Sequence, residues 1–368
     1  MERGRARDFG VTIGTLPTGP RNAITDVEGV RVGHATMVRD PSPGDGKGAV
    51  RTGVTAVFPH EGLPWLERVY AGTHVLNGFG ELIGTNQIAE WGILHSPIVM
   101  TSSLAIGRAY DATIRWRTER YATTTHEGGD MPVVTECDDS FLNDVRSFPL
   151  GDADVFAALD AATIGDVAEG CVGSGTGMHC MDFKGGIGTA SRTVPGGWTV
   201  GVLTMTNFGE RELLRIDGVP VGREITDLMP EEHNDGSCIV VVATDAPMLQ
   251  HQVKRLAVRA GLGLARCGST GHNGSGELMI AFSTASRLPL DADGGVVPVR
   301  ALLDGPASGW PTAFDDLFAA TIEATEESVV NALFMAETTV GRDGNVYHAL
   351  PIDRTLEILA RNGRLPHP

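Results

Sequence analysis

The residues best suited to chemistry are the adjacent pair Gly236-Ser237. The polar turn His233-Asn234-Asp235 precedes them, and an apolar run at 238–243 that predicts a buried strand follows. Glycine adopts backbone angles closed to other residues, so Ser237 Oγ could reach the carbonyl of Gly236. That attack would turn the peptide bond into an ester. Hydrolysis of the ester would leave a serine with a hydroxyl and a free α-amine of pKa about 7.7 to 8.0, a base near neutral pH.

The same residues also fit a structural interpretation. Asn-Asp-Gly-Ser before an apolar run is the usual composition of a turn that enters a strand. On local grounds the chain therefore presents either a self-cleavage site or an ordinary turn at 236–237, and both remain open.

Other catalytic signatures are missing. Lys47 follows a glycine, but a phosphate-binding loop would need glycine where Pro41 stands. The run 173–177 is neither a dinucleotide-binding loop nor a nucleophile elbow, and it predicts a turn. The histidines are scattered without an H-E-x-x-H motif, so no metal site is expected. A serine nucleophile would therefore need a base other than the histidine of a Ser/His/Asp set.

The elements that must position Ser237 are helices and strands mixed along the whole chain. Apolar spacing predicts helices at 249–264 and 314–336, and a last helix capped by Asp353 with Gly363 just past its end. Strands are expected at 54–58, 198–205, 237–243 and around 280–282. This succession indicates a layered sandwich in which Ser237 projects from the edge of a rigid inner strand.

Composition and charge restrict the class of protein. The chain has 368 residues, of which 42% are hydrophobic and 20% charged, as in ordinary globular proteins. A net charge of −17 argues against binding to nucleic acid or to an anionic membrane surface. No long apolar span or signal peptide is evident, so a cytoplasmic location is expected. The five cysteines are odd in number and widely spaced, which predicts reduced core residues.

Several motifs together resemble the DmpA family of self-processing aminopeptidases, which includes the β-peptidyl aminopeptidases. The resemblance covers nearly the whole chain. It is carried by the segments at 21–27, 77–81, 183–192, 206–209, 233–247 and 273–277.

The resemblance implies an α/β (α+β) chain in one domain, residues 1–368, folded as a four-layer α/β/β/α sandwich. Its layers would be those of the N-terminal-nucleophile (Ntn) hydrolases with a different connectivity. Cleavage between Gly236 and Ser237 would give an α subunit of residues 1–236 and a β subunit of residues 237–368. The implied enzyme removes an N-terminal amino acid from a small peptide, amide or ester with a free amino group, β-peptides included. It needs no metal or cofactor and forms a homo-oligomer, a tetramer of αβ units.

The resemblance also assigns roles to residues. Ser237 would be the nucleophile that forms an acyl-enzyme, and Ser275 and Glu277 would complete a Ser-Ser-Glu set. The proton of Ser237 could go to its own α-amine or through Ser275 to Glu277, and the sequence leaves both routes open. Asn207 would donate to the oxyanion, and Glu136 would hold the ammonium group of the substrate.

Phe141 is a departure from the family pattern. It stands where the L-aminopeptidase/D-Ala-esterase of the family has a tyrosine that assists the oxyanion. The substrate preference of that member is therefore not transferred to this chain.

Two alternative functions remain open. The related ornithine acetyltransferases share the fold and the self-cleavage but pass the acyl group to an amine, usually from a threonine nucleophile, and Ser237 counts against them. A binding protein that cuts itself only to mature would give two fragments without turnover.

Overall fold

The computed structural model describes residues 2–42, 44, 46–123, 131–232, 236–304 and 313–365. The predicted turn at 233–235 lies outside these residues. Within them, no helix is both long and apolar enough to cross a membrane.

Two sheets form the centre of the molecule. The five-stranded sheet has the order β1 (Arg31–Arg39), β2 (Val50–Phe58), β6 (Ile98–Ser102), β7 (Val133–Cys137), β4 (Leu82–Ile83). The six-stranded sheet has the order β10 (Ile187–Thr193), β11 (Thr199–Asn207), β12 (Ser237–Thr244), β13 (Gly276–Pro289), β3 (Glu67–Gly78), β5 (Ile93–Leu94). Two short hairpins are formed by β8 (His179–Cys180) with β9 (Phe183–Lys184) and by β14 (Thr339–Val340) with β15 (Val346–Tyr347).

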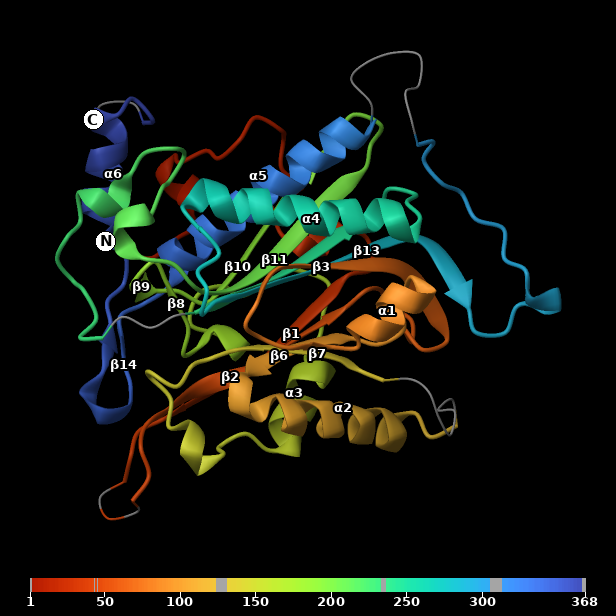
Figure 1. The fold of residues 1–368 in the computed structure, drawn as a ribbon, viewed down its shortest axis with the longest axis horizontal. Helices are drawn as coiled ribbons and strands as arrows, with labels where there is room; N and C mark the ends of the chain where they lie inside the picture. The colour runs from red at the N-terminus through yellow and green to blue at the C-terminus, as the bar shows by residue number, and fades with distance from the viewer. Residues whose placement is uncertain are drawn as a thin grey trace.

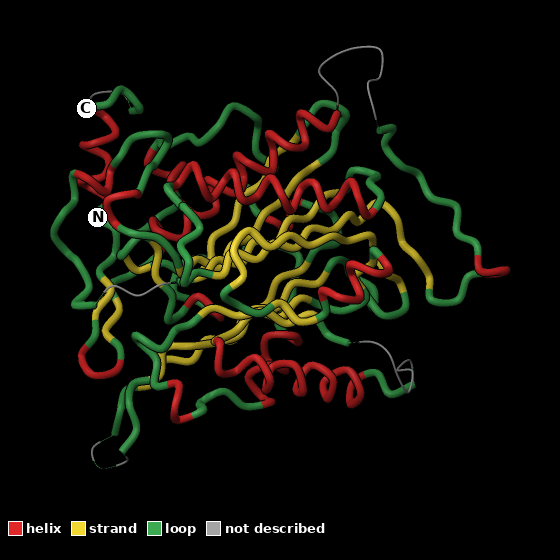
Figure 2. The backbone as a smooth tube through the Cα atoms, in the orientation of Figure 1, coloured by secondary structure: helices red, strands yellow, loops and turns green. Residues whose placement is uncertain are grey.

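Helices cover the outer face of each sheet. The long helices α4 (Gln250–Cys267) and α5 (Ala313–Met335) pack on the six-stranded sheet, and α2 (Ile106–Arg120) and α3 (Asp152–Asp160) pack on the five-stranded one. The shorter helices are α1 (Thr85–Trp91) and α6 (Ile352–Arg361). Figures 1 and 2 show the four layers edge-on, with the strands between two layers of helices. The α/β/β/α prediction is confirmed.

Strand β12 is one continuous apolar run because it is buried on both faces. Val240 and Val242 belong to the core under α4 and α5, while Ile239 and Val241 belong to the core between the two sheets. Because successive side chains alternate between the faces of a strand, an inner strand in a four-layer protein must be apolar on both sides. Ser237 shares the parity of Ile239 and therefore faces the space between the sheets.

The predicted helices are observed with small differences. The helix expected at 249–264 is α4, and it continues through Gly261 and Gly263 to Cys267. Gly263 is required there because a Cβ would lie 2.5 Å from the side chain of Thr325 on α5. The helix expected at 314–336 is α5. Asp353 is not the cap of α6: the N-cap is Pro351, and Asp353 lies in the first turn, where its charge favours the positive end of the helix.

Candidate active site

Ser237 begins β12 between two strands that hold it from both sides. It is paired with Asn207 at the end of antiparallel β11 and with Gly276 at the start of parallel β13. The backbone N–H of Gly276 donates to Ser237 Oγ at 3.2 Å. The predicted nucleophile is therefore buried and fixed at the edge of the inter-sheet layer.

Gly236 is needed for space and not for its backbone angles. It is not among the residues with positive φ, which differs from the expectation based on glycine's conformational freedom. A Cβ at this position would lie 1.6 Å from the carbonyl oxygen of Asn207 and 2.9 Å from Nε2 of His179. Only a residue without a side chain can bring the chain this close to the end of β11.

The variant Gly236→Ala is therefore expected to displace the segment that enters β12 and to stop cleavage before Ser237. The physical reason is the contact of the new methyl group with the Asn207 backbone, which cannot move without disturbing the β11/β12 pairing. Intact mass of the purified protein measures the outcome. Gly261→Ala is the matched control, because its nearest contact would be an ordinary 3.5 Å. Complete cleavage of Gly236→Ala would contradict the steric argument.

Ser275 and Glu277 form a close pair beside Ser237. The hydroxyl of Ser275 donates to Glu277 Oε1 at 2.5 Å, and both side chains are buried. Burial raises the pKa of Glu277, and its second oxygen, Oε2, has no hydrogen-bond partner within the described residues. Among the hydrogen bonds of the described residues, none joins Ser275 directly to Ser237. The two serines are linked through the peptide of Gly276.

The segment 77–81 joins this pair to Glu136. The side-chain amide of Asn77 donates to the carbonyl oxygens of His272 and Ser275 and holds the loop before β13 in place. Four residues later, the backbone N–H of Glu81 donates to Glu136 Oε1 at 2.8 Å. One segment thus positions both the loop that carries Ser275 and the predicted ammonium-binding carboxylate.

Glu136 is a buried carboxylate, although its sequence context resembles a surface position. It lies on β7, and it accepts hydrogen bonds from Ser103 Oγ and from the backbone of Glu81. Burial raises its pKa. Glu136 Oε1 and the Cα of Gly276 both lie within 3.5 Å of the point where a Cβ on Gly80 would stand. The carboxylate therefore faces the same small space as the peptide that holds Ser237.

Asn207 has a fixed side chain at the end of β11. Its Oδ1 accepts the backbone N–H of His179 at 3.1 Å, and its Nδ2 donates to the carbonyl of Asp138 at 2.9 Å. Sequence reasoning missed His179, which appeared as one more isolated histidine. Its ring lies beside Gly236 and is stacked on Tyr347 with ring centroids 5.0 Å apart. No local signal could reveal it, because its contacts come from residues distant in the chain.

Phe141 lies at the outer side of the same aromatic group. Its ring centroid is 4.6 Å from that of Tyr347, which in turn stacks on His179. Phe141 therefore reaches the neighbourhood of Gly236 through two ring contacts and brings no hydroxyl of its own.

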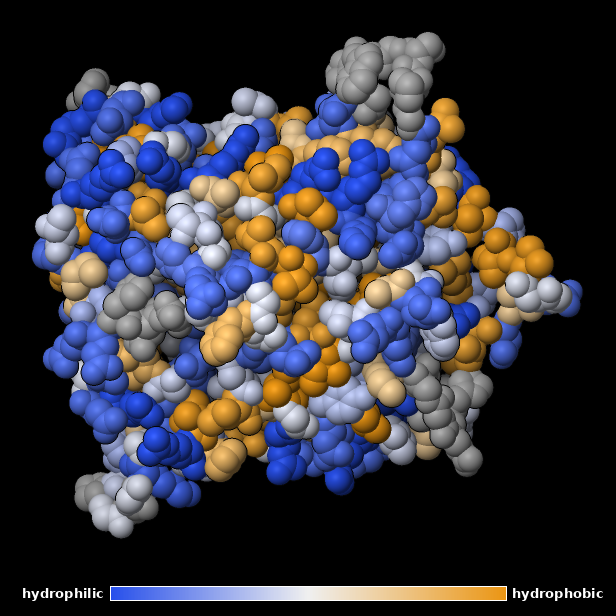
Figure 3. Space-filling model, viewed as in Figure 1, coloured by the Kyte–Doolittle hydropathy of each residue, from blue (hydrophilic) through white to orange (hydrophobic). Residues whose placement is uncertain are grey.

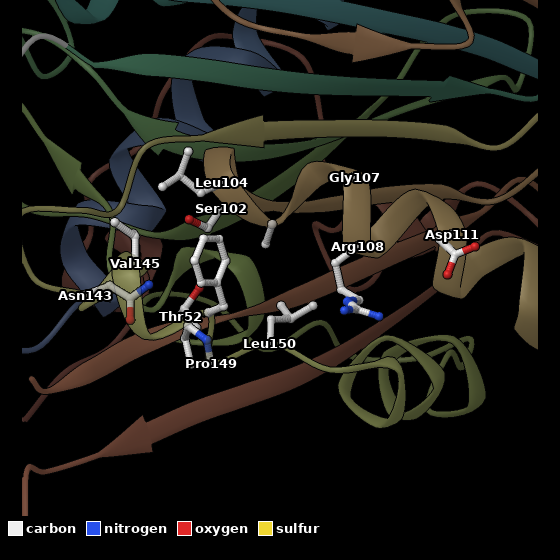
Figure 4. Close-up of a pocket in the computed structure, with 12 residues that line it drawn as sticks. Thr52, Ser102, Leu104, Gly107, Arg108, Asp111, Asn143, Val145, Pro149 and Leu150 are labelled. Carbon is white, nitrogen blue, oxygen red and sulfur yellow. The ribbon is translucent and has the colours of Figure 1, made fainter. Parts of the chain in front are cut away.

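A cavity of about 440 Å³ is lined in part by Ser102 and Leu104, which flank Ser103, the residue that donates to Glu136. Figure 4 shows it between the turn before α2, which carries Leu104, the start of α2 with Arg108, and the segment that carries Val145 and Leu150. Ser237, Ser275, Glu277 and Glu136 are not among the residues that line it.

No set of three His, Cys, Asp or Glu side chains in the described ranges is arranged to hold a metal ion. All five cysteines are free.

Known proteins share this architecture and much of the sequence. The model of peptidase family S58 matches residues 22–347. The beta-peptidyl aminopeptidase BapA of Sphingosinicella microcystinivorans is 41% identical over 99% of this chain and 94% of its own. The L-aminopeptidase D-Ala-esterase/amidase of Ochrobactrum anthropi, a prototype of the serine aminopeptidases with a variant Ntn hydrolase fold, superposes with a TM-score of 0.90 at 43% identity over 98% of this chain and 99% of its own. A Burkholderia sp. beta-aminopeptidase gives a TM-score of 0.86 at 40% identity over 99% and 100%.

The fold and these relatives define an aminopeptidase of the Ntn-type serine hydrolase class. The four layers, with Ser237 at the start of an inner strand, agree with that class. The chain belongs to peptidase family S58.

Proposed function

We propose that the chain cuts itself between Gly236 and Ser237 and then acts as an aminopeptidase with Ser237 as its N-terminal nucleophile. In the first reaction, Ser237 Oγ attacks the Gly236 carbonyl, the C–N bond breaks, and the nitrogen of Ser237 takes the hydroxyl proton. Water hydrolyses the resulting ester, which gives a carboxylate on Gly236 and restores the hydroxyl. The products would be residues 1–236 and 237–368.

In the second reaction, the same hydroxyl attacks the carbonyl of the first residue of a substrate. The C–N or C–O bond breaks, the leaving group departs with a proton, and water then releases the amino acid from the acyl-enzyme. Asn207 is the proposed side-chain donor to the oxyanion. Ser275 and Glu277 are the proposed proton route, with the α-amine of Ser237 as the alternative base.

The observation that carries this proposal is the convergence of Glu136 and Gly276 on one space beside Gly80. A buried carboxylate there can pair with an ammonium group and place the next carbonyl near Ser237. This selects substrates with a free N-terminus, and we propose short peptides, amides and esters, including β-peptides. The named activities of the relatives on β-peptides, amides and esters support this range.

The proposal is tested with the purified wild-type protein. Intact mass should show two fragments that end and begin at Gly236 and Ser237, and aminoacyl p-nitroanilides and β-peptides should be turned over. Fragments without turnover would indicate a protein that cuts itself only to mature. Transfer of the acyl group to added ornithine in preference to water would indicate an acyltransferase.

Glu136→Gln is expected to raise KM by roughly 10- to 100-fold, because a charge-assisted contact with the substrate ammonium contributes about 1.5–3 kcal/mol. The effect on kcat should be smaller, since the proposed role of Glu136 is to bind the ammonium group and not to act on the bond that breaks. The raised pKa of Glu136 also means that wild-type substrate affinity falls as pH drops through a range above that of an ordinary glutamate. Initial rates against pH, for wild type and variant, measure both effects.

The controls for this variant use the substrate. An N-acetylated substrate has no ammonium group, so its slow hydrolysis should be equally slow in both proteins. A Glu136→Gln variant with unchanged KM for free-amine substrates would contradict the assignment.

We also propose that processed αβ units form a homo-oligomer, a tetramer by the family resemblance, and that they work in the cytoplasm. Exposed apolar side chains support an assembly surface: Val75, Leu76 and Phe79, the last 73% exposed, lie around the end of β3, and Leu262 lies on α4. Figure 3 shows apolar residues along the middle of the face that carries α4. Sedimentation of wild type and of Phe79→Asp measures the assembly.

A further inference from the structure

Lys184, on β9, is a fully buried lysine that forms no ion pair with a carboxylate in the described part of the chain, although Asp139 and Cys171 lie near enough to favour its charged form. Its side chain is 0% exposed, and Nζ contacts three backbone carbonyl oxygens: Gly175 at 3.2 Å, Met178 at 2.6 Å and Gly185 at 2.7 Å. The family motif at 183–192 contains this lysine, and neither of the proposed reactions uses it.

Three carbonyl acceptors indicate that Lys184 is held as an ammonium ion. An ammonium has three N–H donors, whereas a neutral amine has two. Burial lowers the pKa of Lys184, which shows the cost of keeping this charge away from water. The retained charge acts on the three peptide groups whose carbonyl oxygens contact Nζ.

Two of the three carbonyls belong to peptide groups that hold the end of β11. The peptide between Met178 and His179 accepts from Lys184 through its oxygen and donates its N–H to Asn207 Oδ1 at 3.1 Å. The peptide between Gly185 and Gly186 likewise accepts from Lys184 and donates its N–H to Thr206 Oγ1 at 3.0 Å. A hydrogen bond to a peptide oxygen from a charged donor strengthens the N–H of the same peptide as a donor.

The partners of Asn207 allow only one orientation of its amide. The N–H of His179 can only donate, so it must meet Oδ1, and the carbonyl of Asp138 can only accept, so it must meet Nδ2. A flipped amide would present oxygen to a developing oxyanion and repel it. The His179 contact, together with the Asp138 carbonyl, therefore keeps the amide in the productive orientation.

We propose that Lys184 is a positioning residue for catalysis, which polarises and fixes the peptides at 178–179 and 185–186 so that the amide of Asn207 faces the oxyanion. The inference rests on the proposed function, in which Asn207 is the oxyanion donor. Lys184 acts on the transition state through Asn207 and does not contact substrate.

The test is a double-mutant cycle of Lys184→Met with Asn207→Ala, measured on processed enzyme with an aminoacyl p-nitroanilide. Lys184→Met keeps the length of the side chain and removes its charge and donors. Asn207→Ala should lower kcat on the order of 10²–10³-fold. Lys184→Met alone should lower kcat roughly 10- to 100-fold with KM unchanged, since it removes part of the same effect. In the Asn207→Ala background, its cost should shrink to about three-fold or less.

A merely structural lysine gives a different result. Equal costs of Lys184→Met in both backgrounds, or a rise in KM without loss of kcat, would overturn the inference. Leu317→Ala, a truncation of a buried core side chain on α5, is the control for lost stability and should leave kcat unchanged. If Asn207→Ala itself costs nothing, the proposed role of Asn207 fails, and that failure is visible without the lysine variant.

Thr206→Val covers the case in which Lys184→Met does not fold or mature. It removes one hydroxyl and releases the peptide at 185–186. It should lower kcat by about 2- to 10-fold, the value of one hydrogen bond, and only while Asn207 is present. The same reduction in the Asn207→Ala background would equally overturn the inference.

Discussion

Ser237→Ala is expected to remain a single chain of 368 residues that does not turn over substrate. Both proposed reactions begin with the hydroxyl of Ser237, and the neighbouring donors cannot replace a nucleophile. Loss of the nucleophile in comparable hydrolases lowers kcat by roughly 10⁴- to 10⁶-fold. Intact mass measures the cut, and release of p-nitroaniline measures turnover.

The matched control is Ser283→Ala, another serine hydroxyl buried in the same sheet. Ser283 lies on β13 and donates to the carbonyl of Ala246, away from the site. This variant should be cut and active. A Ser237→Ala protein that still yields the fragment 1–236 would show that the bond breaks by another route, and the assignment of Ser237 would be lost.

Glu277→Gln is expected to lower kcat by roughly 10²- to 10⁴-fold, the range of a general base, if the proton of Ser237 reaches the carboxylate through Ser275. The amide keeps an acceptor for the Ser275 hydroxyl but cannot take up a proton. Because burial raises the pKa of Glu277, activity that needs the carboxylate should fall with decreasing pH in a range above the ordinary value of about 4.3. Rate against pH for wild type and variant measures the effect.

Glu326→Gln is a suitable control for Glu277→Gln. Glu326 is a buried glutamate on α5 whose pKa is also raised by burial, and its partner is Arg266. Ser275→Ala combined with Glu277→Gln should cost little more than either change alone, because residues that act as one route are not additive. Near-normal rates in Glu277→Gln would instead assign the base to the α-amine of Ser237.

Individual helices and the inner strand could be predicted because the apolar patterns are strong, whereas the four-layer α/β/β/α arrangement was expected from the family resemblance. The run after Ser237 and the helical spacing at 249–264 and 314–336 each match one element of the structure. The cap at Asp353 was wrong because Asp is favoured both at an N-cap and in the first turn, and the sequence does not distinguish these neighbouring positions.

The site was less accessible from local sequence. Glu136 looks like a surface carboxylate until β7 and the segment 77–81 are assembled around it. Gly236 is required by a contact with Asn207, which lies on another strand, so its reason is invisible in the turn itself. Lys184 lies in the motif at 183–192, but the motif does not reveal its burial, because the carbonyl groups that it contacts converge only in the folded chain.

The order of strands in the larger sheet has a consequence for the history of the molecule. A cut before Ser237 would assign β12 and β13 to the fragment 237–368. The strands β10, β11, β3 and β5 would belong to the fragment 1–236, so the two strands of the C-terminal fragment would lie between those of the N-terminal fragment. The two pieces would then share one sheet through two ladders, β11/β12 and β13/β3, and neither could keep its core alone. Before the cut, refolding is a first-order event within one chain. After it, recovery from denaturation requires two chains to meet, so it becomes concentration-dependent and maturation cannot be reversed by unfolding.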